Sequence, residues 1–375
     1  MVGKPFIIGI TGNIASGKSV VRQYLENMGA LAIDADMVAQ RSYSAGAPAF
    51  QHVVAAFGEQ ILDVNHQIDR RVLAEIVFED AKQLQKLEEI VHPHVMAALA
   101  RMIAQSQAKI IAVEAIKLIE TGFDQSCDLV WVVAAEDETR LQRLVKNRSM
   151  SRETASVRLL AQSPQKEKMD QADLVINTDG SFSDTYKQVR QAINRLNLSP
   201  DRPEQRFVLS NDTWLETLTP DQAYPATLLL QRNLTKPLTA EDILSLLSQQ
   251  SLLGIWKVQG LIGLIFWKKG SFVSYINKIV TSKDYHKQIH KESDAEILDL
   301  IIHSSKRHFC EVLALNPNLP LNKRLIKFYE FKTLQIEAIS EPMWRTFFQQ
   351  FLQFDDYLAF RRLIEAELFN NLFII

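Results

Sequence analysis

The sequence predicts an α/β protein in which a parallel sheet carries helices on both faces, followed by a second domain of the α+β class. Three observations predict this. Short apolar runs alternate with helix-like patterns in the first half, a glycine-rich loop follows the first of these runs, and the composition changes near residue 200. The length of 375 residues suits two domains, since domains commonly hold about 100–200 residues.

Five short apolar runs in the first half are expected to be strands, beginning with the run FIIGIT. Because these runs are almost continuously apolar and are separated by helix patterns, they are typical of parallel strands buried on both faces. Helices are expected over 19–28 and through most of 70–105. The expected strands are 6–11, 30–33, 109–114, 128–134 and 173–177.

The two halves differ in their packing material. Of 13 Gly, 9 lie in residues 1–200, whereas 13 of 19 Phe and 4 of 5 Trp lie beyond them. The stretch NLSPDRPE has two prolines and little apolar character, which is typical of a linker. We therefore expect a first domain over 1–198, a linker over 199–206 and a second domain over 207–375.

Charge and cysteine content exclude several classes of protein. The formal net charge of -2 argues against a protein whose main partner is nucleic acid. Two cysteines, Cys127 and Cys310, cannot build a disulfide framework, which favours a reducing, cytoplasmic location. Neither a signal peptide nor a membrane span is expected, and nothing in the sequence supports a homo-oligomer.

The segment GNIASGKS matches the pattern G-x-x-x-x-G-K-[ST] and lies between an expected strand and an expected helix. Glycines let the backbone approach phosphate oxygens, and successive N–H groups with a helix N-terminus supply positive potential. Lys18 can reach the β- and γ-phosphates, and the Ser19 hydroxyl can ligate Mg²⁺. The alternative is a glycine-rich turn that binds nothing. The predicted nucleotide-binding residues here are Gly12, Asn13, Ile14, Ala15, Ser16, Gly17, Lys18, Ser19 and Val20.

Two carboxylates, Asp34 and Asp36, follow the second expected strand. Ligands of open α/β sheets lie at the carboxyl edge of the strands. A carboxylate at that edge could accept the proton of a hydroxyl that attacks the γ-phosphate. The alternative is that one of these residues caps the helix that begins near Met37.

Read in order, the motifs ITGNIASGKS, IDAD, IDRRVLAEIVF, IVHPHV, LQRLVKNR and KMDQADLVINTDGS resemble the dephospho-CoA kinase family over about residues 6–195. The resemblance implies a P-loop kinase sheet with a helical acceptor-binding region and a lid. It implies transfer of the ATP γ-phosphate to the 3′-hydroxyl of dephospho-CoA, the last step of coenzyme A biosynthesis. It also implies ATP and Mg²⁺ as cofactors and a small molecule, not nucleic acid or a membrane, as partner.

The resemblance also implies roles for residues of this chain. Asp36 matches the proposed general base, with Lys18 and Arg143 as further catalytic residues. Arg148 and Asn177 match positions near the nucleotide, and Gln162 matches a pattern after the lid. The predicted substrate-binding residues are Asp34, Arg71, His92, Glu114 and Lys117. From the residues alone, His92 could be a capping or core histidine. A solvated helix face is also open for the basic cluster of Arg140, Arg143, Lys146, Arg148 and Arg152.

One stretch departs from the family. Where D-x-P-L-L-x-E is usual, this chain has EAIKLIE, so that Glu114 replaces the Asp and Lys117 replaces a Leu. The acceptor pocket is therefore expected to differ. This departure keeps two alternatives open, namely a non-catalytic nucleotide- or CoA-binding sensor and a kinase for another nucleotide-like acceptor.

The second half has weaker signals. Strands are expected over 207–209, 226–231, 254–258, 261–268, 272–280 and 311–315, and a helix over 294–307. This order resembles the GNAT acetyltransferase fold. The family's glycine-rich pyrophosphate loop has no counterpart in the glycine-free stretch 285–292, so we expect a degenerate GNAT-like domain. Residues 343–375 have largely helical spacing and are expected to pack on their own domain or to form a dimer contact.

Overall fold

A computed structural model of the chain describes residues 4–148, 150–197, 207–210, 213–231, 238–270, 272–282, 292–321, 323–350, 352 and 356–375. The chain divides into two compact units. Unit 1 holds 1–34, 107–266 and 280–288, and unit 2 holds 35–106, 267–279 and 289–375. Each unit therefore combines segments of both halves of the sequence. The predicted linker, 199–206, lies outside the described residues, and the predicted domain boundaries stay a prediction.

The first sheet, in unit 1, has five parallel strands in the order β2-β3-β1-β4-β5. Each apolar run that predicted a strand in the first half forms one. The parallel α/β architecture of this half is thereby confirmed. The strands are β1 (Phe6–Thr11), β2 (Leu31–Asp34), β3 (Ile110–Glu114), β4 (Leu129–Ala134) and β5 (Leu174–Asn177).

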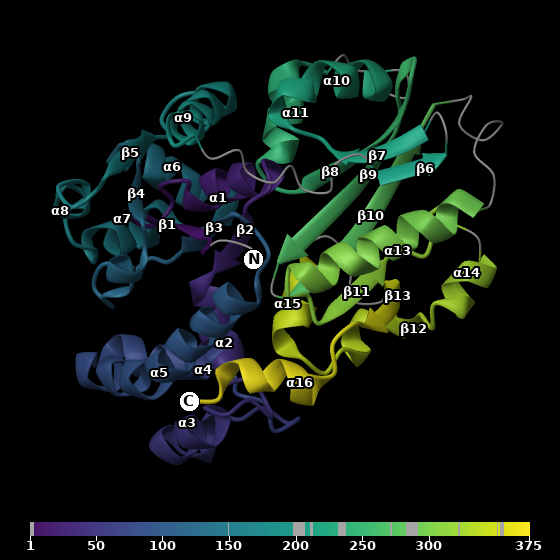
Figure 1. The fold of residues 1–375 in the computed structure, drawn as a ribbon. Helices are drawn as coiled ribbons and strands as arrows, with labels where there is room; N and C mark the ends of the chain where they lie inside the picture. The colour runs from purple at the N-terminus through teal and green to yellow at the C-terminus, as the bar shows by residue number, and fades with distance from the viewer. Residues whose placement is uncertain are drawn as a thin grey trace. The chain divides into compact units, whose positions relative to one another are not determined.

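Helices α1 and α9 lie side by side over one face of this sheet (Figure 1). Tyr24 of α1 and Tyr186 of α9 meet edge to face, with ring centroids 5.5 Å apart. Both rings belong to a core that also holds Ile8, Ile10 and Trp131 of the sheet. The helices of the first half in unit 1 are α1 (Lys18–Asn27), α6 (Asp137–Arg148), α7 (Arg152–Leu160), α8 (Gln165–Met169) and α9 (Phe182–Arg195), with a 3₁₀ turn η2 (Phe123–Ser126).

The same core continues into the second half of the sequence, through Leu229, Ile243 and Leu252 among others. The unit 1 elements of this half are β6 (Phe207–Ser210), β7 (Thr213–Thr217), η3 (Pro220–Gln222), α10 (Ala223–Gln231), α11 (Ala240–Leu247), β8 (Ser251–Lys257) and much of β9 (Gly260–Gly270). Strands β6, β7 and β8 form an antiparallel ladder. They belong to a second, eight-stranded sheet of order β12-β13-β11-β10-β9-β8-β7-β6.

Unit 2 begins with the helices α2 (Ala35–Ser42), α3 (Phe50–Phe57), α4 (Arg70–Glu79) and α5 (Ala81–Gln105), and a 3₁₀ turn η1 (Glu59–Ile61). The first residues of β10 (Val273–Thr281), 273–276, pair in parallel with β11 (Val312–Leu315). Strand β13 (Tyr357–Arg362) pairs antiparallel with both β11 and β12 (Lys332–Gln335). The remaining elements are α13 (Glu292–Arg307), α14 (Lys323–Phe328), η4 (Ile336–Ala338), α15 (Pro342–Gln349), α16 (Ala366–Asn370) and η5 (Asn371–Phe373).

The strand predicted over 226–231 is wrong, because these residues belong to helix α10. A capping box at Thr219 and a proline in the first turn start the preceding 3₁₀ turn, which runs directly into α10. Ala223, Ala226 and Leu230 are buried at helical spacing. A short apolar run bears no periodicity that separates a buried strand from a buried helix, so the capping residues decided the outcome.

The largely helical C-terminus predicted over 343–375 is also wrong in part. Helix α15 and the short α16 flank strand β13, in which Leu358 is fully buried. The strand forms because β11 and β12 lie on either side of it and satisfy its backbone groups. The two strands that pair with β13 come from other parts of the chain, so the local sequence around β13 does not reveal them.

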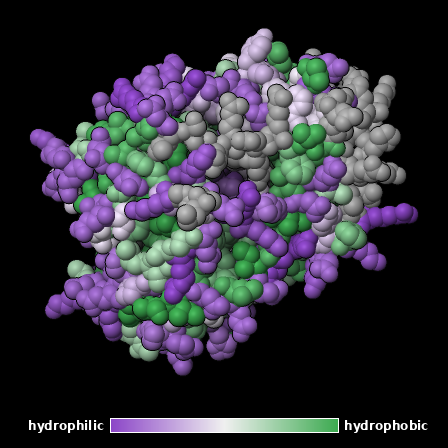
Figure 2. Space-filling view, viewed as in Figure 1, coloured by the Kyte–Doolittle hydropathy of each residue, from purple (hydrophilic) through white to green (hydrophobic). Residues whose placement is uncertain are grey.

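Hydrophilic side chains are interspersed with hydrophobic ones over the face drawn in Figure 2, as is ordinary for a folded protein surface. None of the helices in the described part of the chain has both the length and the apolar character needed to cross a bilayer.

Asn27, at the end of α1, is fully buried and joins α1 to the second half of the sequence within unit 1. Its amide donates to the Leu247 carbonyl over 2.7 Å, and its carbonyl accepts from the Ser251 hydroxyl over 3.0 Å. We expect Asn27→Ala to lower the free energy of unfolding by about 1–3 kcal/mol, because a buried carbonyl loses its donor. Urea denaturation measures this. The matched control, Asn194→Ala on the exposed side of α9, should change it by less than about 0.5 kcal/mol; an equal, small effect of both would contradict the prediction.

Candidate active site

The loop between β1 and α1 has a backbone that only certain residues can adopt. Gly12 has φ of 147°, and a Cβ at this position would lie 2.2 Å from the Val133 carbonyl oxygen. Gly17, which precedes α1, has φ of 94°. Both conformations are open to glycine and strained for other residues. The two glycines of the motif are therefore required by the path of the chain.

Lys18 is buried beneath this loop, with 7% of its surface exposed. Its ammonium donates to the carbonyl oxygens of Gly12 over 2.9 Å and Asn13 over 3.1 Å. The loop thus holds a positive charge against its own backbone, ready for anionic oxygens. The Ser16 hydroxyl is fully buried in the same loop and has no hydrogen-bond partner within the described residues. A phosphate oxygen would supply the partner that this buried hydroxyl lacks.

The tip of the loop is tied to the segment that follows α7. The Ile14 amide donates to the Gln162 side chain over 2.8 Å, and the Asn13 amide group donates to the Ser163 carbonyl over 2.9 Å. One backbone donor of the loop is therefore already engaged by the chain. Gln162 acts here as a support for the loop.

Arg143 of α6 contacts the loop and the end of β5. Its guanidinium donates to the Ala15 carbonyl over 3.1 Å and to the Thr178 hydroxyl over 3.0 Å. Thr178 in turn donates to the Ser16 carbonyl over 2.6 Å. Burial lowers the pKa of Arg143, although Asp179 opposes this. Sequence reasoning gave Thr178 no role, although it lies in the segment KMDQADLVINTDGS and directly follows the last strand of the sheet.

Asn177 ends β5 and is exposed. Its side chain donates to Asp179 over 2.9 Å. Burial opposes ionisation of Asp179, but hydrogen bonds from the Glu136 amide, Thr139 and Asn177 outweigh it, so that the pKa of Asp179 is lowered. Arg148 is the last residue of α6, and its side chain lies outside the described residues.

Two acidic residues lie at the carboxyl edge of the sheet, where Asp34 of β2 pairs in register with Glu114 of β3. Glu114 is buried and forms an ion pair with Arg22 of α1, with 2.6 Å between Nε and Oε2. Burial opposes the charge on Arg22, but Glu114, Asp34 and Glu26 outweigh it and raise its pKa. Arg22 follows the loop motif by one helical turn, and sequence reasoning missed it.

The stretch after β3 that departs from the family pattern is held at the Ile116 carbonyl. This oxygen accepts from the Thr11 hydroxyl over 3.1 Å and from the ammonium of Lys168. Lys168, on α8, is buried and pairs with Glu120 over 2.9 Å. Lys117 lies between these anchored residues and is exposed. Lys168 is the first residue of the segment KMDQADLVINTDGS, but sequence reasoning gave it no role.

The remaining predicted site residues belong to unit 2. Asp36 lies in the first turn of α2, two residues after Asp34, and is exposed. Arg71 is exposed in the first turn of α4, where Asp69 caps its backbone amide. His92 is half-buried on α5. The structure thus places the phosphate loop, Ser19, Asp34, Glu114, Lys117, Arg143 and Asn177 in unit 1.

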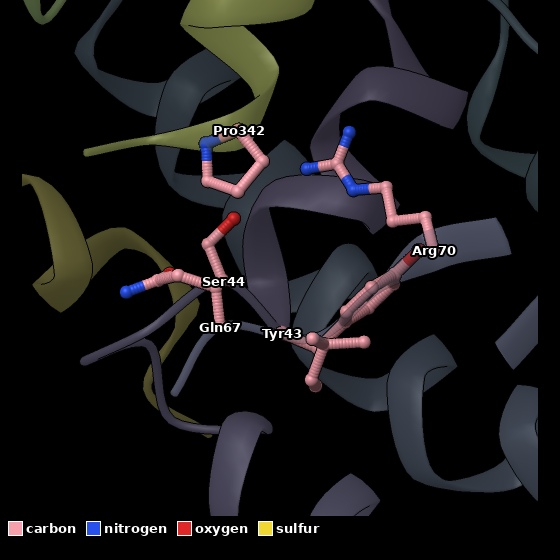
Figure 3. A pocket seen from close by; sticks show the side chains of 6 residues that line it. Tyr43, Ser44, Gln67, Arg70 and Pro342 are labelled. Carbon is pink, nitrogen blue, oxygen red and sulfur yellow. The ribbon is translucent and has the colours of Figure 1, made fainter. Parts of the chain in front are cut away.

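A small pocket of about 10 Å³, room for about one water molecule, lies in unit 2 (Figure 3). Arg70 lines it and donates to the Gln40 side chain over 2.7 Å. Burial lowers the pKa of Arg70, and Tyr43 and Glu341 oppose this. In Figure 3 the Ser44 hydroxyl points towards Pro342. The pocket is smaller than the ~300–1,000 Å³ of typical ligand sites. Its lining is Tyr43, Ser44, Gln67, Ile68, Arg70 and Pro342, so that Arg70, not the predicted Arg71, lies at a pocket.

A five-stranded parallel sheet with a G-x-x-x-x-G-K-S loop after its first strand defines a P-loop nucleotide-binding protein. Comparison with known proteins narrows this class. A family model described as dephospho-CoA kinase matches residues 6–184. The dephospho-CoA kinase of Aquifex aeolicus is 40% identical over 194 residues, which cover 52% of this chain and 98% of that protein. That of Moorella thermoacetica is 38% identical over 195 residues, covering 51% of this chain and 92% of that protein. The chain belongs to the dephospho-CoA kinase family.

The second half resembles GNAT acetyltransferases among solved structures. A GNAT-family acetyltransferase from Streptococcus pneumoniae aligns over 40% of this chain and 99% of its own, with 15% identity and a TM-score of 0.28. The stretch predicted to replace the pyrophosphate loop, 285–292, lies almost entirely outside the described residues.

Replacing Lys168 by Met removes the cation that pairs with Glu120 and donates to the Ile116 carbonyl. We expect the free energy of unfolding to fall by about 1–3 kcal/mol, because hydrogen bonds that involve a charged group contribute about this much. Denaturant titration measures it. Lys166→Met, on the same helix but exposed, serves as the control and should stay within about 0.5 kcal/mol of the wild type. Lys168→Met with wild-type stability would show that the anchor is not formed.

Proposed function

We propose that this chain transfers the γ-phosphate of ATP to the 3′-hydroxyl of dephospho-CoA and releases CoA and ADP. Membership of the family supports the reaction class. The observation that carries the proposal is the loop itself, with Lys18 held at 2.9 Å from the Gly12 carbonyl and the buried Ser16 hydroxyl lacking a partner within the described residues. Both groups can donate to phosphate oxygens without moving far.

Phosphoryl transfer needs positioning and neutralisation of charge more than covalent chemistry. Lys18 and the loop amides bind the β- and γ-phosphate oxygens. Arg143 holds the loop through Ala15 and Thr178, and Arg148, at the end of the same helix, is proposed to lie near the nucleotide. Asp36 accepts the proton of the attacking hydroxyl. Asn177 belongs to the nucleotide side of the site.

The residues present suit Mg²⁺ bound together with ATP. The Ser19 hydroxyl is exposed in the first turn of α1, and Asp34 ends β2 at the carboxyl edge of the same sheet. Within the described part of the chain, no cluster of three or more His, Cys, Asp or Glu side chains could hold a metal ion, so Ser19 and the phosphates would hold it. When bound, Mg²⁺ neutralises phosphate charge.

The acceptor is a small molecule, and Asp34, Arg71, His92, Glu114 and Lys117 are the proposed acceptor-side residues. Glu114 would act through its ion pair with Arg22, which limits how freely its carboxylate can meet a ligand. Lys117, exposed on the anchored stretch after β3, is a cation that phosphate groups of an acceptor could contact. The cytoplasmic location stays a prediction.

The Glu114–Arg22 pair is the observation that favours a different acceptor or a non-catalytic sensor, because the family's Asp at this position has become a neutralised Glu. One assay separates the three functions. Incubation with ATP, Mg²⁺ and dephospho-CoA yields CoA and ADP under our proposal. Tight nucleotide binding without product supports the non-catalytic sensor. Turnover only with another acceptor supports a kinase for that other acceptor.

Asp36→Asn removes the proposed proton acceptor while keeping the size of the side chain. We expect kcat to fall by about 10²–10⁴-fold, the usual contribution of a general base, with ATP affinity unchanged. A coupled ADP-release assay and ATP titration measure the two. Glu75→Gln, an exposed carboxylate on α4, is the control and should leave kcat unaltered. A near-normal kcat for Asp36→Asn would reject the role.

A further inference from the structure

Arg41, on α2, is a buried cation whose counter-ion lies 270 residues further along the chain. Its Nε and Nη2 donate to the two carboxylate oxygens of Glu311 over 2.7 and 3.0 Å. Only 4% of the Arg41 side chain and none of the Glu311 side chain is exposed. A bidentate pair with this burial is geometrically specific, and removing one partner leaves a buried charge uncompensated.

Glu311 is itself held firmly. Its amide donates to the Phe272 carbonyl over 2.7 Å, and its carbonyl accepts from the amides of Leu363 over 2.7 Å and Ile364 over 3.2 Å. It directly precedes β11, in the middle of a three-stranded part of the sheet. A second cation, Arg362, also lies near the carboxylate, with 3.8 Å between its Nη1 and Oε2 of Glu311. The carboxylate is therefore presented to Arg41 from a rigid framework.

Other residues of α2 and the turn after it contact the second half. Met37, next to Asp36, packs against the core formed by Val273, Trp344 and their neighbours. The Phe369 ring lies 5.2 Å from the Arg41 guanidinium. The Ser44 hydroxyl donates to Glu341 over 3.2 Å. Helix α2 and the turn after it are thus contacted by α15 with its N-cap, by α16 and by the residue before β11.

The last residues of the chain also contact the long helix α5 (Figure 1). His94 Nδ1 lies 2.7 Å from the Phe373 carbonyl oxygen, and Arg101 donates to the carbonyls of Leu372 and Ile374. Helices α2 and α5, which these contacts reach, both belong to the first half of the sequence. The expectation that the C-terminus packs on its own domain agrees with the core that joins Trp344 and Phe348 to Val273. The contacts with α5 come in addition, and the dimer contact stays a prediction.

These contacts come from outside the part of the chain that matches the family, since the family match ends at residue 184. The Aquifex aeolicus relative is matched over 98% of its length by about half of this chain. We propose that the second half positions the acceptor-side helices of the kinase, and that Glu311 is a positioning residue that acts through Arg41 on α2. The kinetic part of this inference rests on the proposed function.

The first test reads the position of α2 without any turnover. Hydrogen–deuterium exchange of the full-length chain is compared for the wild type, Glu311→Gln and the control Glu337→Gln, an exposed carboxylate in the same half. We expect Glu311→Gln to speed exchange of α2 amides about tenfold or more, because a buried unpaired guanidinium favours local opening. Exchange in α1 should stay within about twofold. Unchanged exchange in α2, or an equal increase in α1 and α2, would overturn the proposal.

A second variant covers the case in which Glu311→Gln does not fold. The double variant Arg41→Met/Glu311→Met replaces the pair by apolar side chains, which is often neutral for stability. We expect it to fold and to protect α2 to within about threefold of the wild type. If the double variant leaves α2 as exposed as a single substitution does, Glu311 does not act through Arg41 and the proposal fails.

Kinetics then separate a positioning role from general loosening. For Glu311→Gln we expect KM for dephospho-CoA to rise about tenfold, which is about 1.4 kcal/mol of binding, with KM for ATP within about twofold. Equal rises in both would contradict positioning of the acceptor side. If the wild type makes no CoA, the proposed function fails on its own, while the exchange experiment still decides whether the second half holds α2.

Discussion

The loop between β1 and α1 closes because position 12 has no side chain. A Cβ there would collide with the Val133 carbonyl of β4, so the loop passes directly against the neighbouring strand. That path brings the carbonyls of residues 12 and 13 to the ammonium of Lys18 and buries the Ser16 hydroxyl. The placement of both the Lys18 ammonium and the Ser16 hydroxyl depends on this one steric constraint. The contacts from Gln162, Arg143 and Thr178 stabilise the backbone conformation that glycine at position 12 permits.

The second half of the chain carries no nucleotide motif, yet it contacts elements that carry the site. In unit 1, Leu247 and Ser251 bond to Asn27 at the end of α1, the helix that starts with Lys18. In unit 2, Glu311 pairs with Arg41 of α2, the helix that contains Asp36. Buried polar groups of this kind tolerate few alternative partners, so they specify one arrangement. A structural role of the second half follows from these contacts.

The departure from the family pattern after β3 is internally consistent in this chain. Glu114 reaches one methylene further than Asp, and its carboxylate meets Arg22. The backbone beyond it, free of the family's proline, presents the Ile116 carbonyl to Thr11 and Lys168. In this chain the stretch is therefore held by the Glu114–Arg22 ion pair and by the hydrogen bonds to the Ile116 carbonyl. The charges at this edge of the sheet are consequently paired, Glu114 with Arg22 and Lys168 with Glu120.

The strands of the first half and the phosphate loop were predictable from sequence, because continuous apolar runs and a motif of required glycines are local signals. Helix α10 and strand β13 were not, since short apolar runs carry no decisive period and the strand depends on neighbours distant in the chain. The roles of Arg22, Thr178, Lys168 and the pair Arg41–Glu311 were not predicted either, because their partners are also distant in the chain. A charged side chain looks alike in the sequence whether it meets water or a buried partner. Only the tertiary structure, by removing water from some of these groups, decided which charges had to pair.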